Sequence, residues 1–185
     1  MPSDTGKIIK AVKFAADKHR TQMRKNGVTP YINHPVGVAS LLTDAGIDDT
    51  ATIQAAILHD TIEDTKTTRE ELEKEFGKEV SDLVVELTDD KTKSSEARKQ
   101  YQVDHAPHLS PKAKKIKLTD KIANVTDIIN IPPIGWSAKR RTEYLDWAEK
   151  VVNGLSGTNE SLEKLFDETL KEGRKKLQEI ARTNN

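Results

Sequence analysis

Cysteine is absent from the 185-residue sequence. Its absence excludes disulfide bonds and thiolate metal ligands, so any metal site has to use histidine and carboxylate side chains. No apolar run approaches the ~20 residues that a membrane-spanning helix needs, and the N-terminus opens no signal-peptide pattern. These absences predict a soluble, cytoplasmic protein that does not bind membranes.

The chain also lacks a net charge, because 30 Lys and Arg residues balance 30 Asp and Glu residues. A protein without excess positive charge does not attract nucleic acid as a whole, so we expect no nucleic-acid partner. Any anionic ligand has to be bound by a local group of cations. Aromatic residues are scarce, at 4% of the chain, and the abundance of Ala, Leu, Lys and Glu favours helix over sheet.

Helical periodicity runs through nearly the whole chain, with apolar residues recurring at intervals of three and four. The helices expected from this pattern cover roughly residues 4–18, 35–45, 51–58, 68–76, 80–87, 94–104, 111–130, 137–153 and 159–182. Pro35 suits a first helical position, with Asn33 or His34 near the cap. Thr67 resembles the start of a capping box that ends at Glu70.

No strand alternation, internal repeat or low-complexity segment interrupts the helical pattern. The length of the chain fits one ordinary domain with a sizeable core. We therefore predict an all-α helical bundle of about eight to ten helices. The prediction is one domain over residues 1–185, with its core at about 7–182.

The most informative segment is His59-Asp60-Thr61-Ile62-Glu63-Asp64-Thr65, which follows the apolar run at residues 51–58. On a helical wheel the Asp60 carboxylate points along the buried face, where an ionised group is costly unless a cation or hydrogen-bond donors receive it. If the helix continues, Glu63 and Asp64 lie one turn further on the same two faces. A divalent metal would relieve the repulsion among these carboxylates. The alternative is a solvated acidic helix end with a chance His-Asp pair.

Two other helices offer further metal ligands. His34 lies one turn before Val38, on the face that is expected to be buried, although a capping or core histidine is the usual alternative. Asp120 lies on the long helix at residues 111–130. The candidate ligands are two imidazoles and two carboxylates, which suit manganese, iron or zinc: His34, His59, Asp60 and Asp120.

A divalent ion held in this way would have a defined chemistry. It lowers the pKa of a bound water and polarises a phosphoryl oxygen. Glu63 and Asp64 would be close enough to orient that water or to move its proton. This constellation would therefore suit metal-assisted hydrolysis of a phosphorylated ligand, with a His-Asp pair of no function as the alternative.

Three basic clusters at residues 24–25, 91–99 and 112–121 could bind a phosphorylated ligand. Solvated helix faces are the alternative for most of these lysines. Arg24, Lys25 and Lys117 stand out, because they lie within a turn or a short loop of the proposed ligands.

The remaining histidines and aromatic residues carry weaker signals. His19, His105 and His108 have no matching partners in helical register, so we expect them at the surface. Tyr144 and Trp147 are three residues apart on one helix, which favours core positions over a base-stacking platform.

Three ordered motifs resemble those of the HD-domain hydrolases, and more narrowly those of the hydrolase domain of RelA/SpoT proteins. The motifs are Tyr31-Ile32-Asn33-His34-Pro35, His59-Asp60-Thr61-Ile62-Glu63-Asp64-Thr65 and Leu118-Thr119-Asp120-Lys121-Ile122-Ala123-Asn124. The similarity runs from about Ile8 to the last helix. Without a synthetase domain, the chain most resembles the stand-alone metazoan members. The three motifs together are far more specific than a His-Asp pair alone.

This resemblance implies an HD fold with one Mn²⁺ ion per chain, held by the four candidate ligands. It implies hydrolysis of the 3′-pyrophosphate of the alarmones ppGpp and pppGpp, the guanosine 3′,5′-bis(diphosphate) nucleotides of the starvation, or stringent, response. The family's catalytic pair matches Glu63 and Asp64. Substrate contacts are implied for Arg24, Lys25, Asn124 and Tyr144.

Two alternatives stay open on the same scaffold. The family resemblance also implies action on NADPH, with removal of its 2′-phosphate. A non-catalytic nucleotide sensor is the other alternative, although the intact Glu63-Asp64 pair argues against it. The sequence leaves the oligomeric state and any regulatory partner open.

Overall fold

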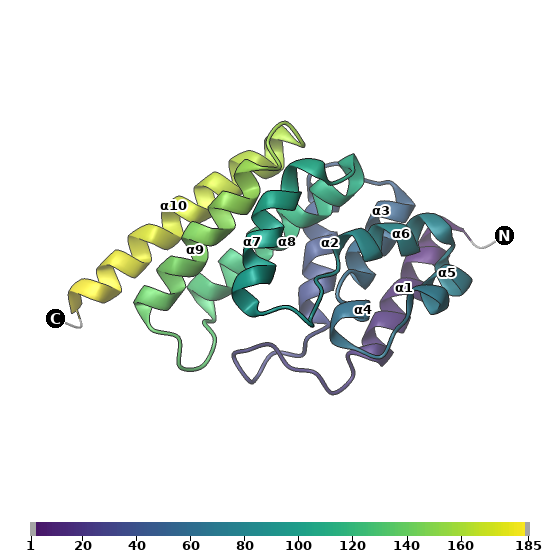
Figure 1. Cartoon of the computed structure of the whole chain (residues 1–185), viewed down its shortest axis with the longest axis horizontal. Coiled ribbons are helices and arrows are strands. Elements are labelled where there is room, and N and C mark those ends of the chain that lie inside the picture. The colour runs from purple at the N-terminus through teal and green to yellow at the C-terminus, as the bar shows by residue number, and fades with distance from the viewer. Residues whose placement is uncertain (1–2, 184–185) are drawn as a thin grey trace.

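The computed structural model describes residues 3–183, and within them the chain forms ten α-helices and one 3₁₀ turn (Figure 1). In chain order they are α1 (Asp4–Lys18), α2 (Asn33–Asp44), α3 (Thr50–Leu58), α4 (Thr61–Asp64), α5 (Arg69–Phe76), α6 (Lys78–Leu87), α7 (Ser95–His105), η1 (Ala106–His108), α8 (Pro111–Asn130), α9 (Ala138–Asn153) and α10 (Glu160–Thr183). No strand occurs in this part of the chain, only an isolated antiparallel bridge between Met23 and Pro30. The predicted all-α fold is confirmed.

Short polar side chains begin most of these helices. In each case the side-chain oxygen accepts a hydrogen bond from the backbone N–H three residues further on. The residues are Ser3, Asp49, Thr68, Ser94, Ser110 and Ser137. Such a cap satisfies an N–H group that the helix leaves unpaired and stabilises the helix by about 1 kcal/mol.

The predicted start of α2 is wrong by two residues. The helix begins at Asn33, and its cap residue Ile32 has no side chain that can accept a hydrogen bond. The backbone supplies the turn instead, because the N–H groups of Asn33 and His34 donate to the carbonyls of Pro30 and Tyr31. The prediction that Asn33 or His34 is the cap is therefore wrong. The His34 side chain makes no capping bond and is buried instead.

The predicted capping box at Thr67 is also wrong, by one residue. The α5 cap is Thr68, which accepts from the N–H of Glu71. The Thr67 hydroxyl is buried and lies 2.8 Å from the Thr65 hydroxyl. Two adjacent threonines offer the same local signal, and the packing of the preceding loop decides between them.

The helix α8 is the centre of the fold. It packs against α2, α3 and α6 and also against α9 and α10, so it lies between the two halves in Figure 1, with the chain termini at opposite ends. Its predicted apolar face is buried: Leu118, Ile122, Val125 and Ile129 are at most 8% exposed. The α10 helix approaches closely at Gly173, where an added Cβ would overlap the Ile129 side chain.

The buried apolar side chains form one connected cluster. A single domain over residues 1–185 nevertheless stays a prediction, and residues 1–2 and 184–185 lie outside the described part. Within residues 3–183, no helix combines the length and the apolar character that a bilayer crossing requires.

Candidate active site

The His-Asp segment interrupts a helix. The α3 helix ends at Leu58, and α4 begins at Thr61, with His59 and Asp60 between them. Thr61 is fully buried, and its hydroxyl donates to the Leu58 carbonyl at 2.7 Å. This hydrogen bond connects the end of α3 to the start of α4. The chain therefore does not continue as one regular helix, and Glu63 and Asp64 belong to a separate short turn.

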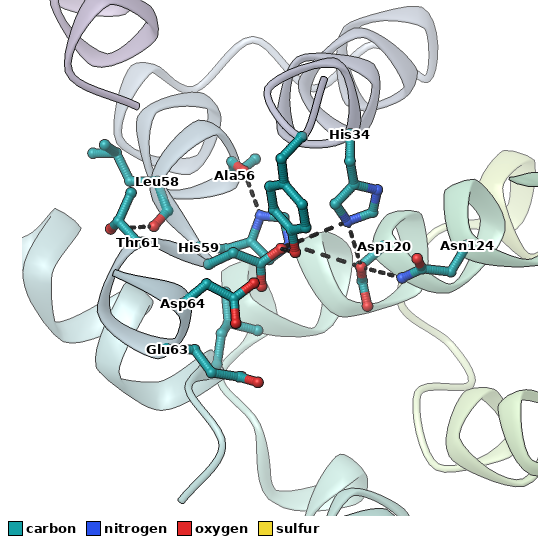
Figure 2. Close-up of polar contacts among 12 residues, drawn as sticks. His34, Ala56, Leu58, His59, Thr61, Glu63, Asp64, Asp120 and Asn124 are labelled. Carbon is teal, nitrogen blue, oxygen red and sulfur yellow. Dashed lines mark hydrogen bonds and ion pairs between the residues drawn. The ribbon is translucent and has the colours of Figure 1, made fainter. Parts of the chain in front are cut away.

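Three candidate ligands meet in the core. His34 from α2, His59 from the end of α3 and Asp120 from α8 are all buried, and one ligand atom of each lies within 4.8 Å of the others. Figure 2 shows their side chains turned toward one another. The Nε2 atoms of His34 and His59 lie 3.0 and 3.7 Å from Asp120 Oδ1. A single divalent ion could be held by this set.

The orientation of the His59 ring suits a metal ligand. Its Nδ1 lies 2.7 Å from the Ala56 carbonyl (Figure 2). A carbonyl only accepts hydrogen bonds, so Nδ1 carries a proton and the lone pair of the neutral ring is on Nε2. Within the described residues this buried Nε2 has no aligned hydrogen-bond partner. The donor atom therefore faces the two carboxylates and is free to bind an ion.

The electrostatics of the cluster favour a cation. Burial disfavours the charged form of His59, but Asp60 and Asp120 outweigh it and raise the pKa of His59 to about 10. Burial also opposes ionisation of Asp120, yet Lys121 and the two histidines hold the pKa of this carboxyl well below its usual range. A bound metal ion would take the place of the proton on His59.

Asp60 lies at the edge of this cluster. Its Oδ2 is 3.1 Å from His59 Nε2 and 3.8 Å from His34 Nε2. The same oxygen accepts a hydrogen bond from the Tyr31 hydroxyl at 2.6 Å. Asp60 is thus within reach of the cluster, but its carboxylate is shared with a tyrosine.

Glu63 and Asp64 occupy different surroundings. Glu63 Oε2 accepts a hydrogen bond from the Asp89 N–H at 3.2 Å. Burial and the Asp60 carboxylate raise the pKa of Glu63. Asp64 Oδ1 pairs with Lys91, and its Oδ2 accepts from Gln22 Nε2 at 2.9 Å. Glu63 is therefore the better proton carrier, and Asp64 is the better-anchored carboxylate.

A cavity of about 660 Å³ lies over these groups. Its walls include the four residues with predicted substrate contacts: Arg24, Lys25, Asn124 and Tyr144. Asn124 connects the wall to the cluster, because its Nδ2 donates to Asp120 Oδ1 at 2.6 Å while its Oδ1 accepts from Arg24 at 2.8 Å. Arg24 also pairs with Asp127 at 2.7 Å. The predicted positions therefore form one continuous surface above the metal cluster.

The family model of the HD domain matches residues 11–135, which contain all four candidate metal ligands. The chain belongs to the HD-domain family. Guanosine-3′,5′-bis(diphosphate) 3′-pyrophosphohydrolase MESH1 of Xenopus tropicalis is 53% identical over 169 residues, which cover 90% of this chain and 94% of the relative. The protein of the same name from Homo sapiens is 51% identical over 174 residues, with 93% and 97% covered.

A solved structure agrees with this assignment. It is described as a metazoan ortholog of SpoT that hydrolyses ppGpp and plays a role in starvation responses. It superposes with a TM-score of 0.88 at 43% identity, covering 93% of this chain and 97% of the other. The predicted resemblance to HD-domain hydrolases of the RelA/SpoT family is confirmed.

Sequence reasoning missed Arg140, which lines the cavity. It offered two of the other features only as possibilities. Trp136, beside the Pro-Pro break, could face a cleft, and Lys91, Arg98 and Lys99 belong to the basic cluster at residues 91–99; all four line the cavity. Nothing local in the sequence shows that residues 91–99 reach α4. The predicted importance of Lys117 is wrong: it does not line the cavity and donates to the Leu87 carbonyl at 3.3 Å.

The aromatic pair on α9 has a double role. Tyr144 and Trp147 are partly buried against the core, as predicted, and both also line the cavity. Their rings meet edge to face, with centroids 5.1 Å apart. Burial raises the pKa of the Tyr144 hydroxyl to about 12, so it is a hydrogen-bond donor at neutral pH.

The prediction that His19 lies at the surface is wrong. His19 is only 3% exposed. Its Nδ1 lies 2.6 Å from Gln22 Oε1, and its ring stacks on Tyr31. Gln22 and Tyr31 lie in the loop after α1, which ends at Lys18, so the fold of this loop and not helical periodicity buries His19. His108 is exposed and His105 half-buried.

Proposed function

We propose that the chain hydrolyses the 3′-pyrophosphate of guanosine 3′,5′-bis(diphosphate), and of pppGpp, to release pyrophosphate and GDP or GTP. The observation that carries the proposal is the juxtaposition of three elements: a buried His-His-Asp cluster, an adjacent carboxylate pair and a cavity lined by several cations. The relatives are named for the same reaction.

The proposed metal is one Mn²⁺ ion, held by His34, His59, Asp60 and Asp120. Imidazole and carboxylate ligands fit manganese, since the site offers no soft donor. The ion supplies Lewis-acid polarisation and an acidified water when it is bound. Manganese itself is an inference from the donor set and from the family resemblance.

Two groups of cations suit a ligand that carries phosphates at separated positions. Lys91 and Arg98 lie 4.0 and 3.8 Å from Glu63 Oε1. Lys25 and Arg140, which also line the cavity, lie over the Trp136 ring, at 5.9 and 4.4 Å from its centroid. A nucleotide with diphosphates on both its 3′ and 5′ oxygens could engage both groups, and charge-assisted contacts of this kind favour phosphate.

The carboxylate pair divides the work on water. Glu63, whose pKa is raised, takes the proton of the attacking water, and Asp64, anchored by Gln22 and Lys91, orients that water. The water oxygen bonds to the phosphorus attached to O3′. The bond between that phosphorus and O3′ breaks, and O3′ leaves with a proton. Arg24, Lys25, Asn124 and Tyr144 hold the nucleotide.

The test is to incubate the purified chain with ppGpp and Mn²⁺ and to measure pyrophosphate and GDP. We expect release by the wild-type chain and a loss of about 100-fold or more in Asp60→Ala and Glu63→Ala. Absence of release, or release that both substitutions leave unchanged, would refute the proposal. Elemental analysis of the purified protein checks the metal independently.

NADPH is the second candidate substrate, because its 2′-phosphate and its pyrophosphate are also separated anionic groups. Measuring kcat/KM for NADPH and ppGpp side by side ranks the two. A nucleotide sensor would instead bind ppGpp tightly without turnover. With ppGpp as substrate, the proposed setting is the starvation response in the cytoplasm.

A further inference from the structure

Gln22 connects a buried histidine to a carboxylate of the proposed catalytic pair. It lies in the loop between α1 and α2 and lines the cavity. Its Nε2 donates to Asp64 Oδ2 at 2.9 Å, and its Oε1 lies 2.6 Å from His19 Nδ1. The Gln22 amide therefore connects buried His19 to Asp64 in the candidate active site.

The chemistry of the two partners fixes the orientation of the Gln22 amide. An ionised carboxylate only accepts hydrogen bonds, so the NH₂ group of Gln22 has to face Asp64. The amide oxygen then faces His19 and can only accept, so His19 Nδ1 carries a proton and donates it. A reversed amide would turn its oxygen toward the Asp64 carboxylate and lose that bond, and it could contact His19 only if the ring proton moved from Nδ1 to Nε2.

His19 is itself held firmly. Its residue is 3% exposed, and its ring stacks on Tyr31 with centroids 4.8 Å apart. Backbone bonds close the loop around it: the Gln22 N–H donates to the His19 carbonyl, and the Tyr31 N–H donates to the Gln22 carbonyl, each at 2.9 Å. The donor at Nδ1 therefore has a fixed position.

The other partner of Asp64 is less restrictive. The Lys91 side chain is 49% exposed, whereas the Asp64 side chain is 18% exposed. An exposed lysine on a flexible stem contributes little to fixing a geometry, because it keeps many rotamers and competes with water. The Gln22 bond is therefore the contact that determines the direction of the Asp64 carboxylate.

We propose that Gln22 and His19 are positioning residues: Gln22 fixes the carboxylate of Asp64, and His19 fixes the amide of Gln22. This inference rests on the proposed function, in which Asp64 orients the attacking water. The competing explanation is that the two bonds only attach the loop to α4 and stabilise the fold.

The first test is Gln22→Met, which keeps the length of the side chain and removes both polar ends. We expect kcat for ppGpp to fall by about 10-fold to 100-fold, the loss of a hydrogen bond to a charged group, with KM within about twofold. The matched control is Gln54→Met. Gln54 is more buried than the half-buried Gln22, and it likewise donates a hydrogen bond, to the Lys7 backbone carbonyl outside the cavity. Its kcat should stay within about twofold.

The second test compares two substitutions of His19. In His19→Asn the side-chain NH₂ takes the place of Nδ1, whereas in His19→Gln it reaches the place of Nε2. We expect His19→Asn to keep kcat within about threefold and His19→Gln to lose as much as Gln22→Met. Equal kcat values for the two variants would contradict the proposal, because a purely structural histidine does not depend on where the donor lies.

A double-mutant cycle separates this inference from the proposed function. In an Asp64→Asn background, Gln22→Met should lower kcat by less than about twofold further, because Gln22 acts through Asp64. Full activity of Asp64→Asn alone would refute the proposed role of Asp64. An inactive Asp64→Asn together with unchanged kcat in Gln22→Met would refute only the positioning role. If Gln22→Met does not fold, the two His19 variants decide.

Discussion

The candidate metal site (His34, His59 and Asp120) and the cationic walls of the cavity (here Lys91 and Arg98) are built in opposite ways. The side chains of His34, His59 and Asp120 are 2%, 7% and 11% exposed, and each residue lies on a helix or at a helix end. The Lys91 and Arg98 side chains are 49% and 28% exposed, and Lys91 lies on a loop. Helix packing in the core positions the candidate metal ligands, whereas more exposed side chains supply the cations of the cavity.

This difference has an energetic consequence. Charges in a buried cluster interact through a medium of low effective dielectric and are little affected by salt. Charges at the mouth of a cavity interact through water and are screened over about 8–10 Å at physiological ionic strength. The cluster should therefore govern the chemical step, and the cationic walls should govern the binding of the substrate.

The largest effect is expected at the buried cluster. His34→Gln removes an imidazole from the candidate metal site, so the metal content should fall from about one ion per chain to almost none, and kcat should fall by about 1000-fold. Elemental analysis and pyrophosphate release measure the two effects. The matched control is His108→Gln on the exposed turn η1, which should change neither. Normal metal content in His34→Gln would show that His34 is not a metal ligand and that the buried site does not depend on it.

A smaller effect is expected where the helical scaffold is tightest. A Cβ at Gly173 on α10 would overlap Ile129 on α8, so Gly173→Ala should lower the free energy of unfolding by about 1–3 kcal/mol. Urea unfolding monitored by circular dichroism measures it. Gly37 on α2 has no neighbouring atom at the place of an added Cβ, and Gly37→Ala should not be destabilising. Equal stability of both variants would show that α10 can shift.

At the cationic walls the expected effect is on KM. Arg98→Met should raise the KM for ppGpp by about tenfold and leave kcat within about threefold. The KM of the wild-type chain should also rise with ionic strength, and it should rise less in the variant. Steady-state kinetics at two salt concentrations measure both. Arg182→Met, at the exposed end of α10, serves as control. A loss confined to kcat would place Arg98 with the buried cluster instead.

The smallest effect is expected at the start of α3, the helix that precedes the His-Asp segment. Asp49 caps α3 and pairs with Lys112 on α8 at 2.8 Å. Burial opposes ionisation, but Lys112 and Thr52 outweigh it and lower the pKa of Asp49 to about 2. Because the folded-state pKa is depressed, ionised Asp49 stabilises the fold above its unfolded-state pKa, and this contribution disappears as the pH falls from about 4 to about 2.

Asp49→Ala should therefore lower the free energy of unfolding by about 1 kcal/mol at neutral pH. The difference from the wild-type chain should shrink as the pH approaches 3. Urea unfolding at pH 7 and pH 3 measures it. A difference that does not change with pH would mean that the side chain acts through packing and not through its charge.

The sequence predicted the parts of the site that helices carry. His34 and the His59-Asp60 pair could be placed because they lie at a fixed offset from apolar residues that have to be buried. Asp120 was expected on the other side of its helix from the apolar residues, and only the structure shows that it is buried. The same reasoning failed for His19, since its partners Gln22 and Tyr31 come from a loop. It also failed for Lys117 and Arg98, because lysines and arginines on polar faces look alike until the packing shows which segment crosses the cavity.

By itself, then, the sequence predicted the all-α fold and the candidate metal ligands from local periodicity and the cost of burying charge. The role of the Glu63-Asp64 pair came from the family resemblance, because the helix that was expected to carry both residues breaks before them. Only the tertiary structure decided that the helix breaks between Leu58 and Thr61, that Lys91 and Arg98 face Glu63, and that Gln22 holds Asp64. The physical reason is that loop conformations and long-range hydrogen bonds depend on contacts between residues that are distant in the sequence.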